Sequence, residues 1–383
     1  MKKPLQIYLN GLLVILLILF TICSKTKRVE QEFRVGLIAP INGKLEGIGT
    51  SVLEGARLAV DEKNSNGGIE VEGIRYKVVT VIKDCQDLPE CAVSVAQELI
   101  NRENVSAIIG PPISGLAIPV GKIASRAFVP MITQMATHPD VTRGTRCVFR
   151  VCFTDDFQGK IMARFVREEL DARSAAVLFD IACPYNRGIA QIFKQSFEEF
   201  GGKVVAFEMY TTREDDFIDQ LVRIRKSGPD VLFLPNYPYD IILQMEQIRE
   251  LGLKTQIIGS DTMSFRNLED IPCIEGAFFS THYSNEIPSQ KVKELFSTYQ
   301  SAFGRMPTIG VVLTYDSFGL LFRAIESQNS IDPELICKGL AEIEGYEGVS
   351  GVISFSGSPD PEKSVVILHV KNGRFRYYTQ IKP

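Results

Sequence analysis

Four polar residues follow directly after apolar segments of strand-like composition, and together their side chains would suit a small zwitterion. They are Ser114 after AIIGPPI, Thr137 after VPMITQMA, Tyr185 after AAVLFDIACP and Asp261 after TQIIGS. In open α/β folds, ligands bind beyond the carboxyl ends of the strands. Hydroxyls and free backbone N–H groups at a helix start suit a carboxylate, and a buried aspartate suits an ammonium group.

Each of these residues also has a plain structural explanation. Ser114 and Thr137 are explained equally well as helix caps, Tyr185 as a half-buried aromatic, and Asp261 as a turn residue. Taken one at a time, the plain explanations are favoured. The zwitterion hypothesis therefore depends on the four residues lying together in the fold.

Other site chemistries have weaker support. No GxSxG nucleophile elbow is present, and GPPISG has a different spacing. The three histidines, His138, His282 and His369, lie far apart, and there is neither an HExxH nor a CxxC motif. The sequence therefore predicts no catalytic residues, no metal and no cofactor.

The glycine-rich stretch GKLEGIGTSVLEGARLAV does not qualify as a dinucleotide fingerprint. Gly47 and Gly49 form a GxG pair, but Val52 stands where the third glycine belongs. The plausible ribose-binding acid, Asp84, comes too late in the sequence. We interpret these glycines as residues that let a strand turn into a helix.

The composition predicts a globular protein of two domains. The 383 residues are 45% hydrophobic and 23% charged, with a formal net charge of −4, and the isoelectric point is near 5.7. At roughly 100–200 residues per domain, this length suits two domains with separate cores. Nucleic-acid binding is disfavoured because there is no basic stripe.

The first 23 residues predict export. Lys2 and Lys3 precede the apolar run LLVILLILFTIC. A positive segment followed by ~7–15 apolar residues is typical of a secretory signal, whereas a spanning helix needs ~20. Cys23 ends the run and resembles the lipidated cysteine of a bacterial lipoprotein signal. We expect a protein in the periplasm or lipid-anchored to the outer face of the cell membrane, with an uncleaved anchor as the alternative.

Seven cysteines follow Cys23, and export permits disulfides among them. They are Cys85, Cys91, Cys147, Cys152, Cys183, Cys273 and Cys337. Cys147 and Cys152 should not bond, because five residues of strand span ~16 Å and bridged Cα atoms lie within ~7 Å. Cys85 and Cys91 lie where a turn enters a helix, so the chain can double back. We expect a disulfide between Cys85 and Cys91 and at least one free thiol.

Apolar strand-like runs alternate with helical patterns along the chain. Strands are expected at Phe33–Ala39, Tyr76–Lys83, Ala107–Gly110, Val129–Thr133, Val148–Phe153, Ala175–Phe179, Lys203–Met209, Val231–Leu234, Gln256–Gly259 and Gly276–Ser280. Solidly apolar runs indicate parallel sheets covered on both faces. These strands are too many for one sheet of ~5–6 strands, so two doubly wound lobes are predicted. Asn372-Gly373, between two apolar runs, predicts a terminal β-hairpin.

Several strings resemble, in order, the type I periplasmic binding proteins that serve ABC importers of branched-chain amino acids. They are VGLIAPINGKLEGIGTSVLEGARLAVDEKNSNGGIEVEG, IIGPPISG, VPMITQMATHPDVT, FRVCFTDDFQGK, LGLKTQIIGSD and GVVLTYDSFGLLFRAIE. The resemblance runs from about Arg34 to Arg374. LAVDEKNSNGGI is quite specific, because a first helix ends there in Asn-x-x-Gly-Gly, where glycine permits a left-handed exit.

The resemblance implies an α/β fold of two doubly wound, Rossmann-like lobes joined by three crossovers, with the ligand between them. Crossovers are then expected near Thr154–Asp155, Ser280–Ser284 and Glu347–Val352. The implied domains are 1–23 as signal, 33–154 plus 281–348 as lobe 1, and 155–280 plus 349–383 as lobe 2.

The resemblance also implies which residues hold the ligand. The implied set is Ser114, Ala136 and Thr137 for the ligand carboxylate, Asp261 for its ammonium group, and Tyr185 and Tyr237 beside it. Two positions depart from the family pattern. Ile48 stands where an aromatic residue is usual, and Met135 where a small residue or proline is usual. The side-chain pocket therefore differs, and leucine, isoleucine, valine, other small amino acids, amides and aromatic acids stay open as ligands.

The function that the resemblance implies is a non-catalytic, monomeric substrate-binding protein that delivers an amino acid or amide to a membrane permease. The alternative is a ligand-binding sensor of a signalling or amide-responsive system. A third hypothesis, a nucleotide-dependent oxidoreductase, lacks a fingerprint and a poised acid–base pair.

Overall fold

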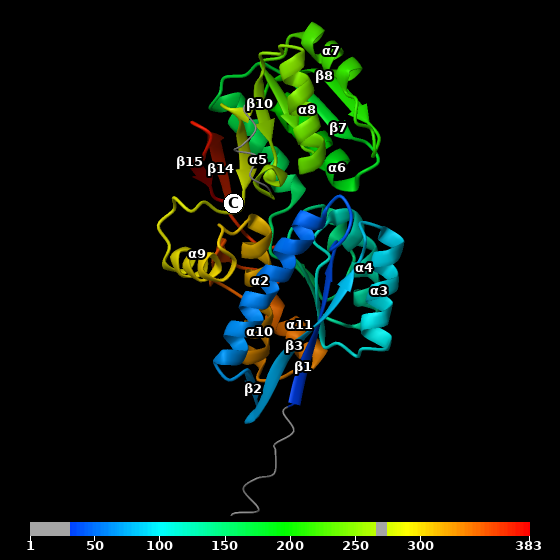
Figure 1. The fold of residues 1–383 in the computed structure, drawn as a ribbon, viewed down its shortest axis with the longest axis vertical. Coiled ribbons are helices and arrows are strands. Elements are labelled where there is room, and N and C mark those ends of the chain that lie inside the picture. The colour runs from blue at the N-terminus through cyan, green and yellow to red at the C-terminus, as the bar shows by residue number, and fades with distance from the viewer. Residues whose placement is uncertain (1–30, 266–273) are drawn as a thin grey trace, which may run out of the picture.

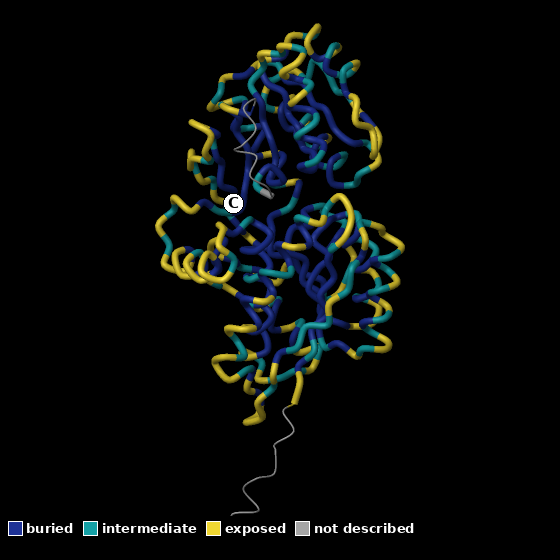
Figure 2. The backbone as a smooth tube through the Cα atoms, viewed as in Figure 1, coloured by how far each residue is buried: buried dark blue, intermediate teal, exposed yellow. Residues whose placement is uncertain are grey.

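The chain forms two α/β lobes that lie end to end (Figure 1). The computed structural model describes residues 31–265 and 274–383, so Cys23 and Cys273 lie outside the described residues. Each lobe contains one large sheet. Buried residues follow the two sheets, and exposed residues lie at the periphery of both lobes (Figure 2). The predicted division into two lobes is confirmed.

The first sheet has the strand order β2-β3-β1-β4-β5-β6. Its strands are β1 (Gln31–Ala39), β2 (Ile69–Val71), β3 (Ile74–Asp84), β4 (Ala107–Ile109), β5 (Met131–Thr133) and β6 (Val148–Arg150). All neighbours are parallel except β2, which pairs antiparallel with β3. Strands β4, β5 and β6 are buried along their whole length, which is why most of their residues are apolar. Arg150 at the end of β6 is a buried charged exception.

The second sheet has the order β15-β14-β11-β10-β9-β7-β8. Its strands are β7 (Ser174–Asp180), β8 (Lys203–Tyr210), β9 (Val231–Leu234), β10 (Gln256–Gly259), β11 (Phe278–Thr281), β14 (Val365–Val370) and β15 (Phe375–Ile381). The last two are antiparallel. They form the predicted hairpin, in which Asn372 and Gly373 both have positive φ. A separate two-stranded sheet joins β12 (Tyr346–Gly348) and β13 (Gly351–Ile353).

Helices cover both sheets. Those of the first lobe are α2 (Glu46–Ser65), α3 (Pro89–Asn101), α4 (Ser114–Ala127), α9 (Gln290–Phe303), α10 (Ile309–Gln328) and α11 (Pro333–Ala341), with the short η1 (Pro139–Val141). Those of the second lobe are α5 (Asp155–Glu168), α6 (Pro184–Glu199), α7 (Ile218–Ser227) and α8 (Pro238–Glu250), with η2 (Asp261–Phe265). The sequence pattern missed α11, although Asp332 caps it and Pro333 occupies its first turn.

Two glycines let α2 approach its neighbours closely. A Cβ on Gly49 would lie 1.9 Å from the carbonyl oxygen of Pro40, which follows β1. A Cβ on Gly55 would lie 2.5 Å from the carbonyl oxygen of Val311 in α10. The first glycine-rich turn therefore brings a helix against the end of a strand, which agrees with the interpretation from the sequence.

The connections between the lobes lie side by side. Phe153, after β6, stacks on His282, after β11, with ring centroids 3.8 Å apart. The buried Lys363 amine donates to the Val151 carbonyl at 3.3 Å and also to the Ser350 hydroxyl. Three chain segments thus meet at one buried point between the lobes.

Part of the final segment packs on the first lobe. The Phe355 amide donates to the Ile343 carbonyl, and the Pro359 carbonyl accepts from the Arg150 amide at 3.3 Å. Because the chain returns to the second sheet only at Val365, we infer that the third crossover lies near residue 363 rather than at 347–352.

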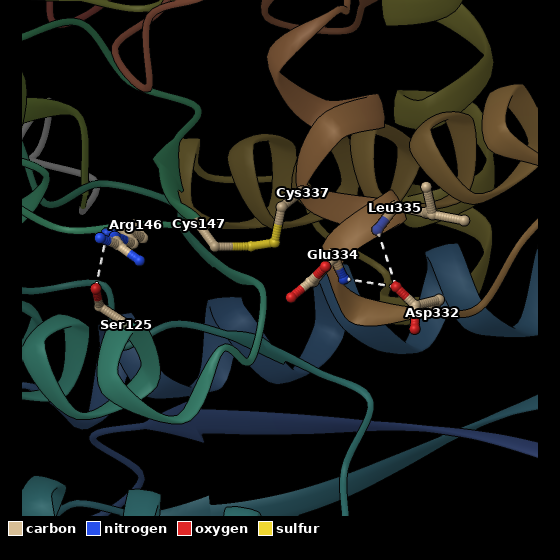
Figure 3. The surroundings of a disulfide bond; sticks show 7 residues. All are labelled: Ser125, Arg146, Cys147, Asp332, Glu334, Leu335 and Cys337. Carbon is tan, nitrogen blue, oxygen red and sulfur yellow. Dashed lines mark hydrogen bonds between the residues drawn. A yellow bond between two sulfur atoms is a disulfide. The ribbon is translucent and has the colours of Figure 1, made fainter.

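The expected disulfide between Cys85 and Cys91 is wrong. Both residues are free thiols, and the Cys91 sulfur lies 3.6 Å from the Asp84 carbonyl oxygen. The bond joins Cys147, just before β6, to Cys337 in α11, with Cα atoms 5.2 Å apart (Figure 3). The partners are 190 residues apart in sequence, so local spacing gave no sign of the pair.

Candidate ligand-binding site

The residues predicted to hold a carboxylate lie together at the carboxyl end of the first sheet. Ser114 is the first residue of α4, and its Oγ accepts a hydrogen bond from the His138 amide at 3.3 Å. Ser114, Ala136 and Thr137 are all buried, with at most 1% of their surface exposed. The Thr137 Oγ1 has no hydrogen-bond partner among the described residues. This hydroxyl is therefore available to a ligand oxygen.

Arg150 holds this loop in place. Its guanidinium donates to the carbonyls of Ala136 and His138 at 2.9 and 3.1 Å, and to the Thr142 hydroxyl at 2.8 Å. The Nε atom lies 2.6 Å from a carboxylate oxygen of Asp360. The fully buried guanidinium thus fixes the loop through a fork of donors that lysine cannot reproduce. No motif in the sequence marks this arginine, which stands at the end of β6.

The residues predicted to hold an ammonium group lie together on the second lobe. Asp261, which follows β10, is 2% exposed. Its Oδ1 accepts from the Tyr185 hydroxyl and the Gln158 amide, each at 2.9 Å, and its Oδ2 lies 3.4 Å from His282 Nε2. Burial lowers the pKa of His282 to about 4, although Asp261 acts in the opposite direction. The ring is therefore neutral near pH 7.

No cationic side chain of residues 31–265 and 274–383 balances the Asp261 carboxylate. Within the described ranges, no lysine or arginine forms an ion pair with it. Burying a carboxylate without a cation is costly, so a bound ammonium group would be stabilised there. Tyr237 packs beside the site, with its ring centroid 5.6 Å from that of Tyr185. The structure thus groups Asp261 with both predicted tyrosines.

Asp155 is a second buried carboxylate that sequence reasoning missed. It begins α5, directly after the first crossover, and is fully buried. Its amide donates to the Thr137 carbonyl at 2.9 Å, whereas both carboxylate oxygens lack hydrogen-bond partners among the described residues. Burial raises the pKa of Asp155 well above its usual range; the nearby Thr137 side chain acts against this shift, and Asp261 acts in the same direction as burial. A cationic group of the ligand would offset the free-energy cost of burying the ionised Asp155 carboxylate. The available signal was its position in FRVCFTDDFQGK, one of the family-like strings.

The two groups of residues face one another across the junction between the lobes. A Cβ on Gly115 of α4 would lie 3.8 Å from the Cδ of Pro184 in α6. A Cβ on Gly188 of α6 would lie 3.0 Å from the His138 ring and 3.8 Å from Asp155. The starts of α4 and α6 therefore meet, with hydroxyl groups on one lobe and carboxylates on the other.

A further contact joins the lobes beside this site. The Lys44 amine, in the first glycine-rich turn, lies 4.7 Å from the ring centroid of Tyr239 at the start of α8. Next to it, the buried Asp240 accepts from the Tyr210 hydroxyl at 2.9 Å. Burial raises the pKa of Asp240 to about 7, with Asp180 acting in the same direction and Lys44 against it.

This raised pKa predicts a pH-dependent stability. The folded state holds more protons than the unfolded chain between pH ~4 and ~7, so the Asp240 contribution to stability falls as the pH rises through that window. Asp240→Asn should remove this loss. The unfolding free energy of the variant relative to wild type should then rise by on the order of 2 kcal/mol between pH 5 and pH 8. Urea unfolding at both pH values measures the difference.

The exposed carboxylate Asp219 in α7 provides the control. Asp219→Asn should leave the difference between the two pH values as in wild type. An Asp240→Asn variant whose stability relative to wild type does not change with pH would contradict the raised pKa.

Other features of the described residues point to no competing site. A cavity of about 530 Å³ lies between α10, α11 and β12, but none of the buried unpaired polar atoms belongs to its lining. Within residues 31–265 and 274–383, no cluster of three or more histidine, cysteine, aspartate or glutamate residues is arranged to hold a metal ion. No helix in these ranges has the length and apolarity that crossing a membrane requires.

The sequence matches the family model described as Periplasmic binding protein over residues 32–373. A curated relative, the Leu/Ile/Val-binding protein BraC3 of Rhizobium johnstonii, is 33% identical over 236 residues. That match covers 61% of this chain and 63% of the relative, which is less than two thirds of its length.

Two solved structures are similar over nearly the whole chain. The leucine-binding protein LivK of Thermotoga maritima is 32% identical with a TM-score of 0.85, over 91% of this chain and 99% of that one. The branched-chain amino acid transporter substrate-binding protein LivJ of Streptococcus pneumoniae, in complex with isoleucine, is 29% identical with a TM-score of 0.85. Its match covers 92% of this chain and all of that one.

Proposed function

The chain belongs to the periplasmic binding protein family, and on that premise we propose that it is the substrate-binding protein of an ABC importer. Its ligand is an amino acid, held between the two lobes without chemical conversion. The names of its relatives make leucine, isoleucine and valine the first candidates. The family consists of substrate-binding proteins, and such a protein delivers its ligand to a membrane permease.

One observation carries this proposal. Buried polar atoms without a hydrogen-bond partner among the described residues lie on both sides of the junction between the lobes: the Thr137 hydroxyl on one side, and the Asp155 carboxylate near Asp261 on the other. Buried polar groups normally have partners. A zwitterion supplies both at once, with its carboxylate at Ser114, Ala136 and Thr137 and its ammonium group at the two aspartates.

The same arrangement supports a closing mechanism. A ligand that touches both lobes stabilises the closed arrangement, because it makes contacts there that the open one lacks. Tyr185 and Tyr237 then cover the ligand from the second lobe. The contact of Lys44 with Tyr239 closes the edge of the site. The permease would recognise this closed form.

Asp261→Ala should weaken amino-acid binding by about 1.5–3 kcal/mol, because a charge-assisted hydrogen bond to the ammonium group is lost. Isothermal titration calorimetry with leucine, isoleucine and valine, and then with the other amino acids, measures the change. Des-amino analogues, which lack the ammonium group, should bind weakly to wild type and should lose no further affinity in the variant.

Asp156→Ala is the matched control, because Asp156 is an exposed aspartate next to the site in sequence. It should bind the amino acid as tightly as wild type does. The proposal fails if wild type binds no amino acid, or if Asp261→Ala binds the ligand with unchanged affinity.

Family membership implies that the chain is exported. We propose that the segment 1–23 directs export and that cleavage before Cys23 leaves this cysteine as the lipidated first residue of the mature protein. We also propose that lobe 1 comprises residues 33–154 and 281–363 and that lobe 2 comprises 155–280 and 364–383, so that the expected boundary at 348/349 moves to the third crossover near residue 363. The mass of the mature protein from its native host distinguishes a lipidated Cys23 from an unmodified one.

A further inference from the structure

Gln134 is a buried amide that the zwitterion leaves unexplained. Its side chain is fully buried, yet neither Oε1 nor Nε2 has a hydrogen-bond partner among the described residues. An amide offers two donors and two acceptor lone pairs. Burying all of them unpaired is costly, and native proteins rarely tolerate it. A partner for this amide is therefore expected.

The position of Gln134 places that partner at the ligand site. The residue follows β5 and stands two residues before Ala136. Its Nε2 lies 3.6 Å from where a Cβ on Gly110 would be, and the Ile38 carbonyl oxygen lies 2.3 Å from the same point. The amide therefore lies at the carboxyl ends of β1, β4 and β5. This is the edge of a parallel sheet at which ligands bind.

Among the described residues, the neighbouring polar groups form no hydrogen bond with the Gln134 side chain. The Thr133 hydroxyl donates to the Pro111 carbonyl at 2.6 Å, and the Ser114 hydroxyl accepts from the His138 amide. The charged groups of an amino acid are accounted for by Thr137 and the two aspartates. The part of the ligand that is left to meet Gln134 is its side chain.

The same region also contains apolar side chains. Ile48 and Met135 are 4% and 5% exposed. The Met135 Cε lies 3.5 Å from where a Cβ on Gly310 would be, and the Ser51 side chain lies beside the same point. The ligand side chain would thus meet apolar surface together with one amide.

We propose that Gln134 determines the specificity of this site, so that the preferred amino acids carry a hydrogen-bonding group on the side chain, an amide or a hydroxyl. This inference rests on the proposed function. It narrows the ligand from any small amino acid to a polar one, in contrast to the aliphatic ligands for which the relatives are named. The reason is that an aliphatic side chain would leave the Gln134 amide without a partner.

Pairs of amino acids with nearly the same shape test the inference directly. Wild type should bind asparagine more tightly than leucine, and threonine more tightly than valine, each by roughly 5- to 150-fold in dissociation constant. In Gln134→Met, which keeps the volume and removes the amide, leucine and valine should bind at least as tightly as their polar partners. Calorimetry on both proteins gives the four ratios.

Gln195→Met is the control, because Gln195 is an exposed glutamine in α6, and it should keep the wild-type ratios. Comparing two ligands on the same wild-type protein keeps the test valid even if Gln134→Met does not fold. Leucine binding to wild type as tightly as asparagine would overturn the inference and leave the proposed function intact. A Gln134→Met variant with unchanged ratios of dissociation constants would overturn the inference too, because water and not the ligand would then form the hydrogen bonds of the Gln134 amide. Failure of wild type to bind any amino acid would remove the proposed function and this inference with it.

Discussion

Replacing Arg150 with methionine is expected to lower the free energy of unfolding by about 3–5 kcal/mol and to weaken amino-acid binding. The substitution leaves three acceptors without their donor: the carbonyls of Ala136 and His138 and the hydroxyl of Thr142. Each buried acceptor that is left without a donor lowers the free energy of unfolding by about 1–3 kcal/mol. Asp360 is 35% exposed, so water replaces the guanidinium at that carboxylate.

Binding should weaken because the loop held by Arg150 carries Ala136 and Thr137. Without the guanidinium the loop is no longer held in the geometry that receives the ligand carboxylate. Urea unfolding measures the stability, and calorimetry with the best ligand measures the affinity. Arg150→Lys should recover only part of the stability and part of the affinity, because an ammonium group does not form the planar fork of donors.

Arg143→Met is the control for loss of an arginine in the same region. Arg143 is 69% exposed and pairs with Asp140 on the surface, so its loss should change stability by less than about 0.5 kcal/mol. If Arg150→Met kept wild-type stability and affinity, Arg150 would not be a positioning residue.

Loss of the disulfide should lower the free energy of unfolding by about 2–5 kcal/mol. The bond between Cys147 and Cys337 closes a loop across 190 residues of sequence, and a large closed loop strongly restricts the unfolded chain. The double variant Cys147→Ser, Cys337→Ser should show this loss in urea unfolding. Ligand affinity should change by less than about 0.5 kcal/mol, because Cys147 precedes β6 and the site lies beyond its other end.

Treatment with a reducing agent tests whether the bond joins Cys147 to Cys337, as in the structure, or Cys85 to Cys91, as expected from the sequence. Dithiothreitol should destabilise wild type and should have no effect on the Cys147→Ser, Cys337→Ser variant. The variant Cys85→Ser, Cys91→Ser should respond to the reagent as wild type does. If that variant lost its response instead, the bond would join Cys85 to Cys91 and the pairing in the structure would be wrong.

The alternation of strands and helices could be predicted because it depends on local patterns. Fully buried strands such as Val231–Leu234 consist of apolar residues, and the Asn372-Gly373 turn carries its own signal through positive φ. Short or half-exposed elements were missed, namely β2, β12 and α11. Such elements depend on packing from distant parts of the chain more than on their own pattern.

Part of the site was visible in the sequence for the same reason. Ser114, Thr137, Tyr185 and Asp261 follow apolar strands, and parallel strands bring their carboxyl ends to one edge of a sheet. Their positions within each lobe could therefore be inferred. Their environment could not, because burial and hydrogen-bond partners come from chain segments far away in sequence.

By itself, the sequence determined the α/β class, the two lobes and the residues at the strand ends, because local patterning and chain order specify them. Only the tertiary structure decided that Cys147 pairs with Cys337 and that Arg150 holds the loop at Ala136. It also decided that the side chains of Asp155 and Gln134 are buried without hydrogen-bond partners in the part of the chain that the structure describes. The physical reason is that pairing, burial and polar satisfaction depend on distances between residues that are remote in the chain, and a linear pattern contains no such distances.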